Sequence, residues 1–169
     1  MRCAAFLVGL TLAWPGLPPS ARAGDNFEIR VPGKGSLGVV DGKVYFVDPP
    51  QRAGCRDWRL VLEDGFPQDI ITMGGKWVGW YLTADPKTGG VRLCKKQGRG
   101  LKWKLTTKEL TELAFTVQAA EGKFKGCYLE VEERGLRRGK GKGRYTLYRV
   151  KLAKKPGPNS KMRFTVVAH

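Results

Sequence analysis

The chain has 169 residues, of which 31 are Lys or Arg, 15 are Asp or Glu and one is His, so its net charge is +16. Its 41% of hydrophobic residues are enough for a core, which excludes an intrinsically disordered chain, and its length fits one ordinary domain rather than two. A large positive surplus on a chain that folds indicates an anionic partner.

Residues 1–23 are typical of a secretory signal peptide. Arg2 supplies a positive charge before an apolar run at 4–14, and a small-residue cleavage site ends at Ala23. The run is too short to span a membrane, which takes about 20 residues. We therefore expect cleavage near Ala23, a secreted, periplasmic or extracellular location, and a mature chain 24–169 without a membrane span.

Three cysteines remain after cleavage: Cys55, Cys94 and Cys127. They are too few for a disulfide scaffold, and their spacing carries no zinc signature. An odd number leaves at least one thiol without an intramolecular partner. All three fit buried, small, apolar side chains, and if one bridge forms we expect it between Cys94 and Cys127.

The first third of the mature chain is predicted to form four strands. Apolar and charged residues alternate in the first of them, as in a half-buried strand. Asp41 and Gly42 separate the next two strands and suit a tight hairpin, since both residue types tolerate a positive φ. The expected strands are 27–31, 37–40, 44–47 and 57–62.

Two further units repeat this order, and a short connecting helix is predicted between them at 106–115. Thr106 and Glu109 have capping-box spacing, and apolar residues recur on one helical face after them. Segments 133–143 and 154–160, rich in Gly, Pro and charge, are expected to be loops inserted into the last unit. The expected strands are 69–73, 76–82, 90–94 and 101–106, then 115–117, 124–131, 144–152 and 161–167.

Each unit carries a Gly-Lys turn motif and a large apolar residue near its end. Self-similarity at a period of roughly 20 to 50 residues indicates a repeat fold. Twelve strands in three units of four resemble a β-trefoil, which implies a single all-β domain with repeats at about 26–65, 66–112 and 113–169. Equivalent core positions are expected at Trp58, Trp103 and Met162, and at Leu37, Val78 and Phe124.

The repeats are similar to those of ricin B-type lectins, which end in a Gln-x-Trp triplet. Here the triplets are 56–58, 101–103 and 160–162, so the Gln is absent throughout and the Trp is lost once. A ricin-type lectin would bind neutral sugars with a carboxylate and a stacking ring, while turn Asp and strand aromatic residues also have structural roles. The possible sugar contacts are Asp41 with Tyr45, and Trp80 with Asp85.

Two stretches of sequence are rich in basic residues and contain no acidic one. Glycine-rich backbone around Arg and Lys allows these side chains to adapt to phosphate, sulfate or carboxylate groups, although charge runs are also found on merely solvated loops. Fibroblast-growth-factor-like trefoils hold sulfated glycans with a similar charge logic. The candidate polyanion-binding residues are Arg92, Lys95, Lys96, Arg99 and Lys102, and Arg134, Arg137, Arg138, Lys140, Lys142 and Arg144.

No set of residues indicates catalysis, a cofactor or a metal. Residues 33–38 satisfy the GxGxxG dinucleotide fingerprint, but a strand and turn follow where the motif needs a helix. The single His169 is terminal, and no GxSxG nucleophile motif occurs. We expect a non-catalytic module.

The leading hypothesis is a monomeric, exported module that binds an anionic glycan or another extracellular polyanion through 92–104 and 134–155. Nucleic acid would be a non-specific ligand in vitro only, because the protein is expected to be exported. A neutral-sugar lectin and a protein-interaction or protease-inhibitor trefoil, as in the Kunitz soybean-type inhibitors, are the alternatives. Binding that weakens steeply with salt distinguishes the polyanion hypothesis from both.

Overall fold

A computed structural model describes residues 26–60, 65–95, 101–106 and 114–167. The predicted signal peptide and residues 107–113 of the predicted helix lie outside this part of the chain, whereas Ala114 and Phe115, expected to end that helix, begin a strand. The described residues contain thirteen strands, five short 3-10 turns and no α-helix. The all-β prediction is confirmed.

Grouped by the repeats expected at about 26–65, 66–112 and 113–169, the segments contain four, four and five strands. The first unit holds β1 (Asn26–Val31), β2 (Gly35–Val40), β3 (Lys43–Asp48) and β4 (Asp57–Arg59). The second holds β5 (Ile71–Thr72), β6 (Tyr81–Ala84), β7 (Val91–Cys94) and β8 (Trp103–Thr106). The third holds β9 (Ala114–Ala119), β10 (Tyr128–Val131), β11 (Leu136–Arg138), β12 (Tyr145–Ala153) and β13 (Lys161–Val166).

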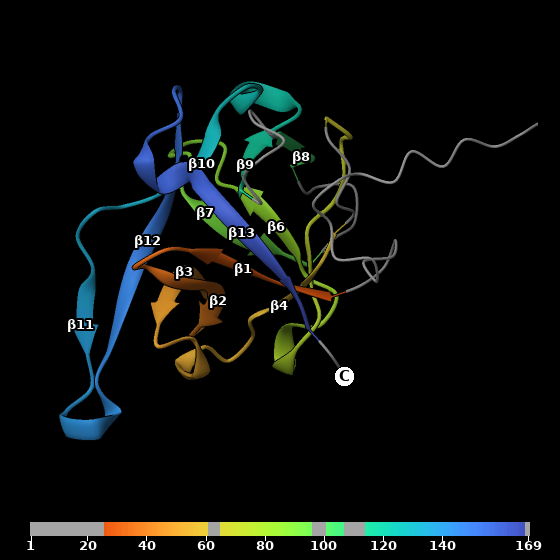
Figure 1. The fold of residues 1–169 in the computed structure, drawn as a ribbon. Coiled ribbons are helices and arrows are strands. Elements are labelled where there is room, and N and C mark those ends of the chain that lie inside the picture. The colour runs from red at the N-terminus through yellow and green to blue at the C-terminus, as the bar shows by residue number, and fades with distance from the viewer. Residues whose placement is uncertain (1–25, 61–64, 96–100, 107–113, 168–169) are drawn as a thin grey trace, which may run out of the picture.

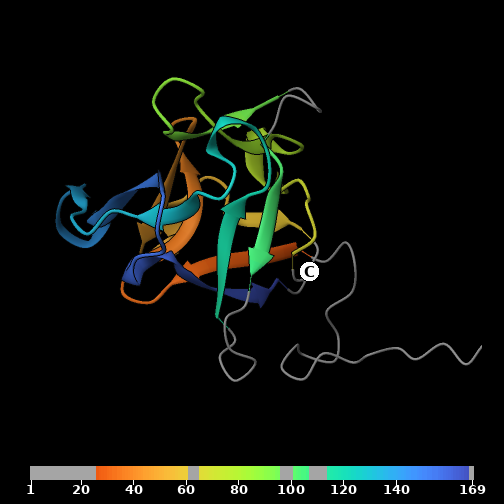
Figure 2. The same cartoon turned by 90° about the horizontal axis from the view of Figure 1, so that it is seen from above.

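Seven strands form a closed barrel. Pairing runs β13-β9-β10-β12-β3-β2-β1, and β1 closes the circuit by pairing with β13. In Figure 1, β1 and β13 cross the front of the barrel side by side, and Figure 2 shows the barrel from above. Closure of the barrel leaves few unpaired strand edges with which a strand of another chain can pair.

The remaining strands extend this barrel. β4 pairs with β1 and leads through β5 and β6 to β7, while β8 pairs with β9 and β11 with β12. An isolated bridge between Gln68 and Trp103 connects the segment before β5 to β8. Each unit is therefore tied to its neighbours through its first and last strands.

The core contains four of the six apolar residues that the repeats predicted, among them Leu37. Trp58, Trp103 and Met162 are fully buried. The Trp58 indole N–H donates to the carbonyl of Leu37 at 2.9 Å, and the Trp103 indole N–H donates to that of Leu82 at the same distance. A buried indole N–H needs an acceptor, so these bonds fix both rings.

The expected core position of Val78 is wrong, since its side chain is 56% exposed. Leu82, not Val78, accepts from Trp103 the hydrogen bond that Leu37 accepts from Trp58. The Gly-Lys motif placed the core residue of this segment at Val78 because a strand was expected at 76–82. Residues 75–77 form a 3-10 turn instead, and the strand begins only at Tyr81. Phe124, expected in the core, packs against it and is partly buried.

The local structure confirms one predicted turn and differs from two other predictions. The hairpin at Asp41 and Gly42 is confirmed, with φ of 50° and 76°. A strand, β11, lies within 133–143, where a loop was expected. The expected disulfide between Cys94, at the end of β7, and Cys127, just before β10, is not formed.

Cys55 is also free and is buried, and burial raises the pKa of its thiol. In the described part of the chain, no helix has the length and apolar character to cross a membrane.

Candidate functional site

The basic segment 134–145, which we call the basic arm, is an ordered hairpin. β11 pairs with the beginning of β12 through Leu136 with Leu147, Arg137 with Thr146, and Arg138 with Tyr145. The hairpin projects from the barrel at the lower left of Figure 1 and at the left of Figure 2. The arm therefore presents its side chains to solvent on a defined backbone.

Glycines build the tip of the arm, which contains the 3-10 turn η4 (Gly141–Gly143). Gly139 and Gly141 have φ of 77° and 54°, a region that side chains other than glycine rarely adopt. The amide of Gly143 donates to the carbonyl of Lys140 at 3.0 Å. A Cβ on Gly139 would overlap the carbonyl of Gly143, so the close approach itself requires glycine.

The base of the arm packs closely against the barrel. Gly135 lies against the side chains of Thr146 and Tyr148, where a Cβ would overlap both. Leu147 is buried, and from Thr146 to Arg149 the same strand β12 also pairs with β3. The arm is thus an extension of a barrel strand.

A cluster of polar contacts holds the segment just before the arm. Lys34 is buried, its Nζ donates to the backbone carbonyl of Glu133 at 2.7 Å, and it lies 4.7 Å from the centroid of the Tyr148 ring. Lys34 also forms a 3.3 Å ion pair with the Glu133 carboxylate, which accepts a 2.6 Å hydrogen bond from Asn159. The Asn159 amide, and then Lys34, lower the pKa of Glu133 below its usual value.

The described basic side chains of the arm are exposed. None of those described forms an ion pair with an acidic residue in the described part of the chain. Lys142 contributes its backbone to η4, and its side chain is not described. The exposed basic residues of the arm are Arg134, Arg137, Arg138, Lys140 and Arg144.

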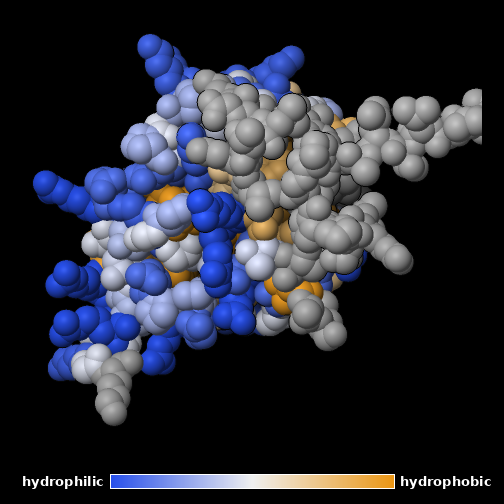
Figure 3. All heavy atoms as spheres, in the orientation of Figure 1, coloured by the Kyte–Doolittle hydropathy of each residue, from blue (hydrophilic) through white to orange (hydrophobic). Residues whose placement is uncertain are grey.

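The structure adds a cation that sequence reasoning missed. Arg52 ends the 3-10 turn η1 (Pro50–Arg52), and its guanidinium lies close to Gly143 at the tip of the arm. No spacing in the sequence connects these two residues, which come together because β12 pairs with β3 just before η1. Figure 3 shows hydrophilic residues gathered on this side of the molecule.

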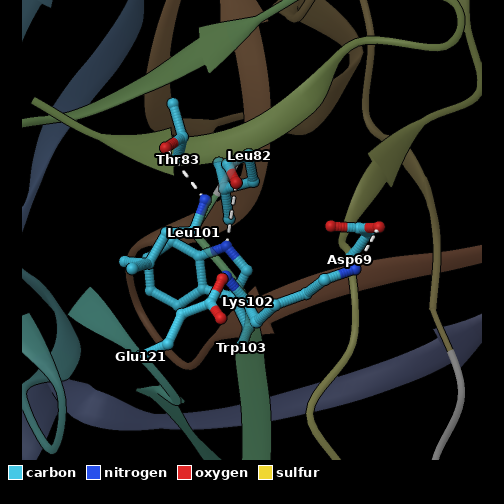
Figure 4. Close-up of polar contacts among 7 residues, drawn as sticks. All are labelled: Asp69, Leu82, Thr83, Leu101, Lys102, Trp103 and Glu121. Carbon is cyan, nitrogen blue, oxygen red and sulfur yellow. Dashed lines mark hydrogen bonds and ion pairs between the residues drawn. The ribbon is translucent and has the colours of Figure 1, made fainter. Parts of the chain in front are cut away.

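The second candidate set is distributed differently. Arg92 and Lys95 are exposed, whereas Lys96 and Arg99 lie outside the described residues. Lys102 forms a 2.7 Å ion pair with Asp69, and its backbone N–H donates to Glu121 at 3.1 Å (Figure 4). The stretch contains no acid in sequence, but folding brings two carboxylates to it.

The possible sugar contacts are not gathered into one site. Asp41 is exposed in its hairpin turn, and Tyr45 is half-buried in β3. Trp80 directly precedes β6 and Asp85 directly follows it, so they are roughly 16 Å apart at the usual rise of a strand. The Asp85 carboxylate accepts hydrogen bonds from the amides of Lys87 and Thr88, which lower its pKa and give it a role in the turn.

Within the described residues, no three His, Cys, Asp or Glu side chains are placed to hold a metal ion. No protein-family model matches the sequence, and no curated protein is similar to it. The functional assignment therefore depends on the surface itself.

Proposed function

We propose that this protein is an exported, non-catalytic binding module that holds an anionic glycan or another extracellular polyanion on its basic arm. The observation that carries the proposal is the exposure of five basic side chains on one projecting hairpin, with no acidic residue between 134 and 145. Arg52 adds its charge beside the tip.

The arrangement favours an extended anionic polymer. Arginine guanidinium groups form paired hydrogen bonds with sulfate, phosphate and carboxylate, and they remain charged at all physiological pH values. Because the arm is a hairpin, successive side chains alternate between its two faces, and neighbours on one face are about 6.8 Å apart. Charges spread in this way over both faces would contact several anionic groups and release their counterions together.

We also propose that the fold is a β-trefoil. A second circuit of strands supports this proposal: β1-β4-β5 continues through the Gln68–Trp103 bridge to β8, β9 and β13, and β13 returns to β1. The matching indole hydrogen bonds of Trp58 and Trp103, each to a carbonyl 21 residues earlier, support equivalent units. The 3-10 turns η2 (Gly75–Trp77) and η3 (Gly122–Phe124) each begin at a glycine of positive φ.

Retention on a heparin column as a function of salt tests the proposed function. Replacing Arg137, Arg138, Lys140 and Lys142 with Gln should lower the eluting salt concentration markedly, since fewer counterions are released on binding. A matched control removes four exposed charges elsewhere, by substituting Gln for Arg59, Lys43, Lys87 and Lys125. If both variants elute alike, net charge rather than the arm governs binding.

A further inference from the structure

We propose that an open cleft beside the base of the arm is a separate site for one anionic sugar residue. The cleft has a volume of about 460 Å³ and lies between the β1–β13 pair, the β1–β2 turn and η1. This volume falls in the range of small-molecule sites, about 300 to 1,000 Å³. The residues that the argument uses are Arg30, Arg163, Thr165, Ser36, Asp48 and Pro50.

Two arginines face each other in this cleft. Arg30 on β1 is directly opposite Arg163 on β13 in the strand register, and both line the cleft. Side chains in such positions have Cβ atoms about 4.5–5.5 Å apart, and like charges there are destabilising. Arg163 is exposed and forms no ion pair in the described part of the chain, so an oxyanion between the two guanidiniums would remove the repulsion.

Buried neighbours fix Arg30 for this role. The Glu28 carboxylate, 11% exposed, forms a 3.0 Å ion pair with Arg30 and accepts a 2.6 Å hydrogen bond from Ser36. One guanidinium has five N–H donors, so this single contact leaves Arg30 with donors for a ligand. Glu28 therefore orients one arginine while the charge of Arg163 stays unneutralised.

The rest of the cleft fits the body of a sugar rather than a bare ion. The exposed Asp48 carboxylate lines it and would accept hydrogen bonds from hydroxyl groups, and the Thr165 hydroxyl lies on the same strand face as Arg163. The ring of Pro50 adds an apolar surface to the wall. The ligand class is a monosaccharide unit with a carboxylate, sulfate or phosphate group.

The cleft adjoins the arm. Asp48 on β3 is opposite Thr146 on β12, which is opposite Arg137 on β11. Neighbouring strands are about 4.8 Å apart, so the row from cleft to arm spans about 10 Å. This inference rests on the proposed function insofar as it names a sugar unit of the polyanion, but the cleft is tested with monosaccharides that cannot span to the arm.

The test is calorimetric titration of the purified protein with glucuronate, glucose 6-sulfate, glucose 6-phosphate, glucose and inorganic sulfate at low ionic strength. We expect at least one sugar anion to bind with a dissociation constant of about 1 mM or lower, and glucose to bind far more weakly. Arg163→Gln should weaken this binding at least about tenfold, since a charge-assisted hydrogen bond is lost. Arg59→Gln and the four-residue arm variant should leave it unchanged.

A thermal melt checks that the Arg163→Gln variant is folded. Arg163→Gln should melt at the same temperature as the parent or higher, because it removes a cross-strand repulsion. Asp48→Asn should weaken binding of the sugar anions more than that of inorganic sulfate.

Several outcomes would overturn the inference: no sugar anion binds, Arg163→Gln binds as well as the parent, or inorganic sulfate binds as tightly as glucose 6-sulfate. Arm-dependent heparin retention without monosaccharide binding would end this inference and leave the proposed function intact. Monosaccharide binding without arm-dependent heparin retention would end the proposed function of the arm and leave the cleft as a sugar-anion site.

Discussion

The basic arm and the surroundings of Lys102 have similar sequences and different charge environments. Both stretches are basic and free of acids along the chain. In the fold, the arm extends into solvent and its described cations remain unpaired, whereas Lys102 lies 2.7 Å from Asp69 and next to Glu121. Asp69 is 33 residues away from Lys102 in sequence, so only the strand pairing reveals the ion pair.

The difference shows when a charge run indicates binding. A basic stretch within the barrel acquires partners from neighbouring strands, because strand pairing places other side chains about 5 Å away. A basic stretch that projects as a two-stranded hairpin has few neighbours, so its field reaches solvent. Projection from the fold, together with charge, distinguishes the two stretches.

The largest expected effect comes from reversing charges on the arm. Arg137→Glu with Arg138→Glu and Lys140→Glu should reduce heparin affinity by about a thousandfold or more at low salt, since three contacts become repulsions. The matched reversal uses Arg92, Lys95 and Lys125, which are exposed outside the arm. Affinity measured for both variants at several salt concentrations tests the comparison, and equal losses would show that net charge, rather than the arm, governs the binding.

The arm's position can be disturbed without changing its charge. Gly135→Ala places a methyl group against Thr146 and Tyr148, which should cost about 1–3 kcal/mol of unfolding free energy through overpacking. Heparin affinity should fall with it, because the cations move relative to one another. Denaturant unfolding and column retention measure the two effects. Leu136→Ala is the control, since Leu136 is 43% exposed and should change stability by less than about 0.5 kcal/mol.

Breaking the Lys102 ion pair should have a smaller effect. Lys102→Gln should lower the free energy of unfolding by about 1 kcal/mol or less, because the Lys102 side chain is 38% exposed and solvent screens the pair. Heparin retention should hardly change, because this cation is already neutralised. A double-mutant cycle with Asp69→Asn isolates the pair energy. A large loss of retention in Lys102→Gln would show that the ion pair opens for the ligand.

Much of the fold could be predicted from sequence because it depends on local patterns. The tight turn at Asp41 and Gly42 and the buried positions of Trp58, Trp103 and Met162 follow from turn chemistry and repetition. The exposure of Val78 could not be predicted, because a 3-10 turn shifts the register of the second unit by an amount that the Gly-Lys motif does not show.

The candidate sites were predictable only in part, for a physical reason. The charge of the arm is visible in the sequence, but its strand β11 is not, since one leucine and two arginines lack the β-branched and aromatic residues enriched in strands, and pairing with β12 decides the structure. Arg30 and Arg163 are near opposite ends of the described chain, and they meet only because β1 closes the barrel against β13. Closure is a property of the whole fold.

The smallest expected effect is on the attachment of the arm at acidic pH. The pKa of Glu133 is lower in the folded protein than its usual 4.5, so its contacts with Asn159 and Lys34 contribute fully above that value. This contribution should be lost as the pH falls below about 4.5 and through the lower pKa of the folded state, because protonation weakens both contacts. Glu133 is exposed, so we expect local loosening rather than unfolding.

Amide hydrogen exchange at Arg134 and Gly135, corrected for its intrinsic pH dependence, measures this loosening. Exchange should accelerate toward low pH in the parent and be pH-independent in Glu133→Gln, whose neutral side chain cannot respond. Glu132→Gln, one residue earlier, keeps the Glu133 carboxylate and should behave as the parent does. Identical profiles in the parent and Glu133→Gln would show that the pairing of β11 with β12 alone holds the arm, and that the contacts of Glu133 with Lys34 and Asn159 do not help to attach it to the barrel.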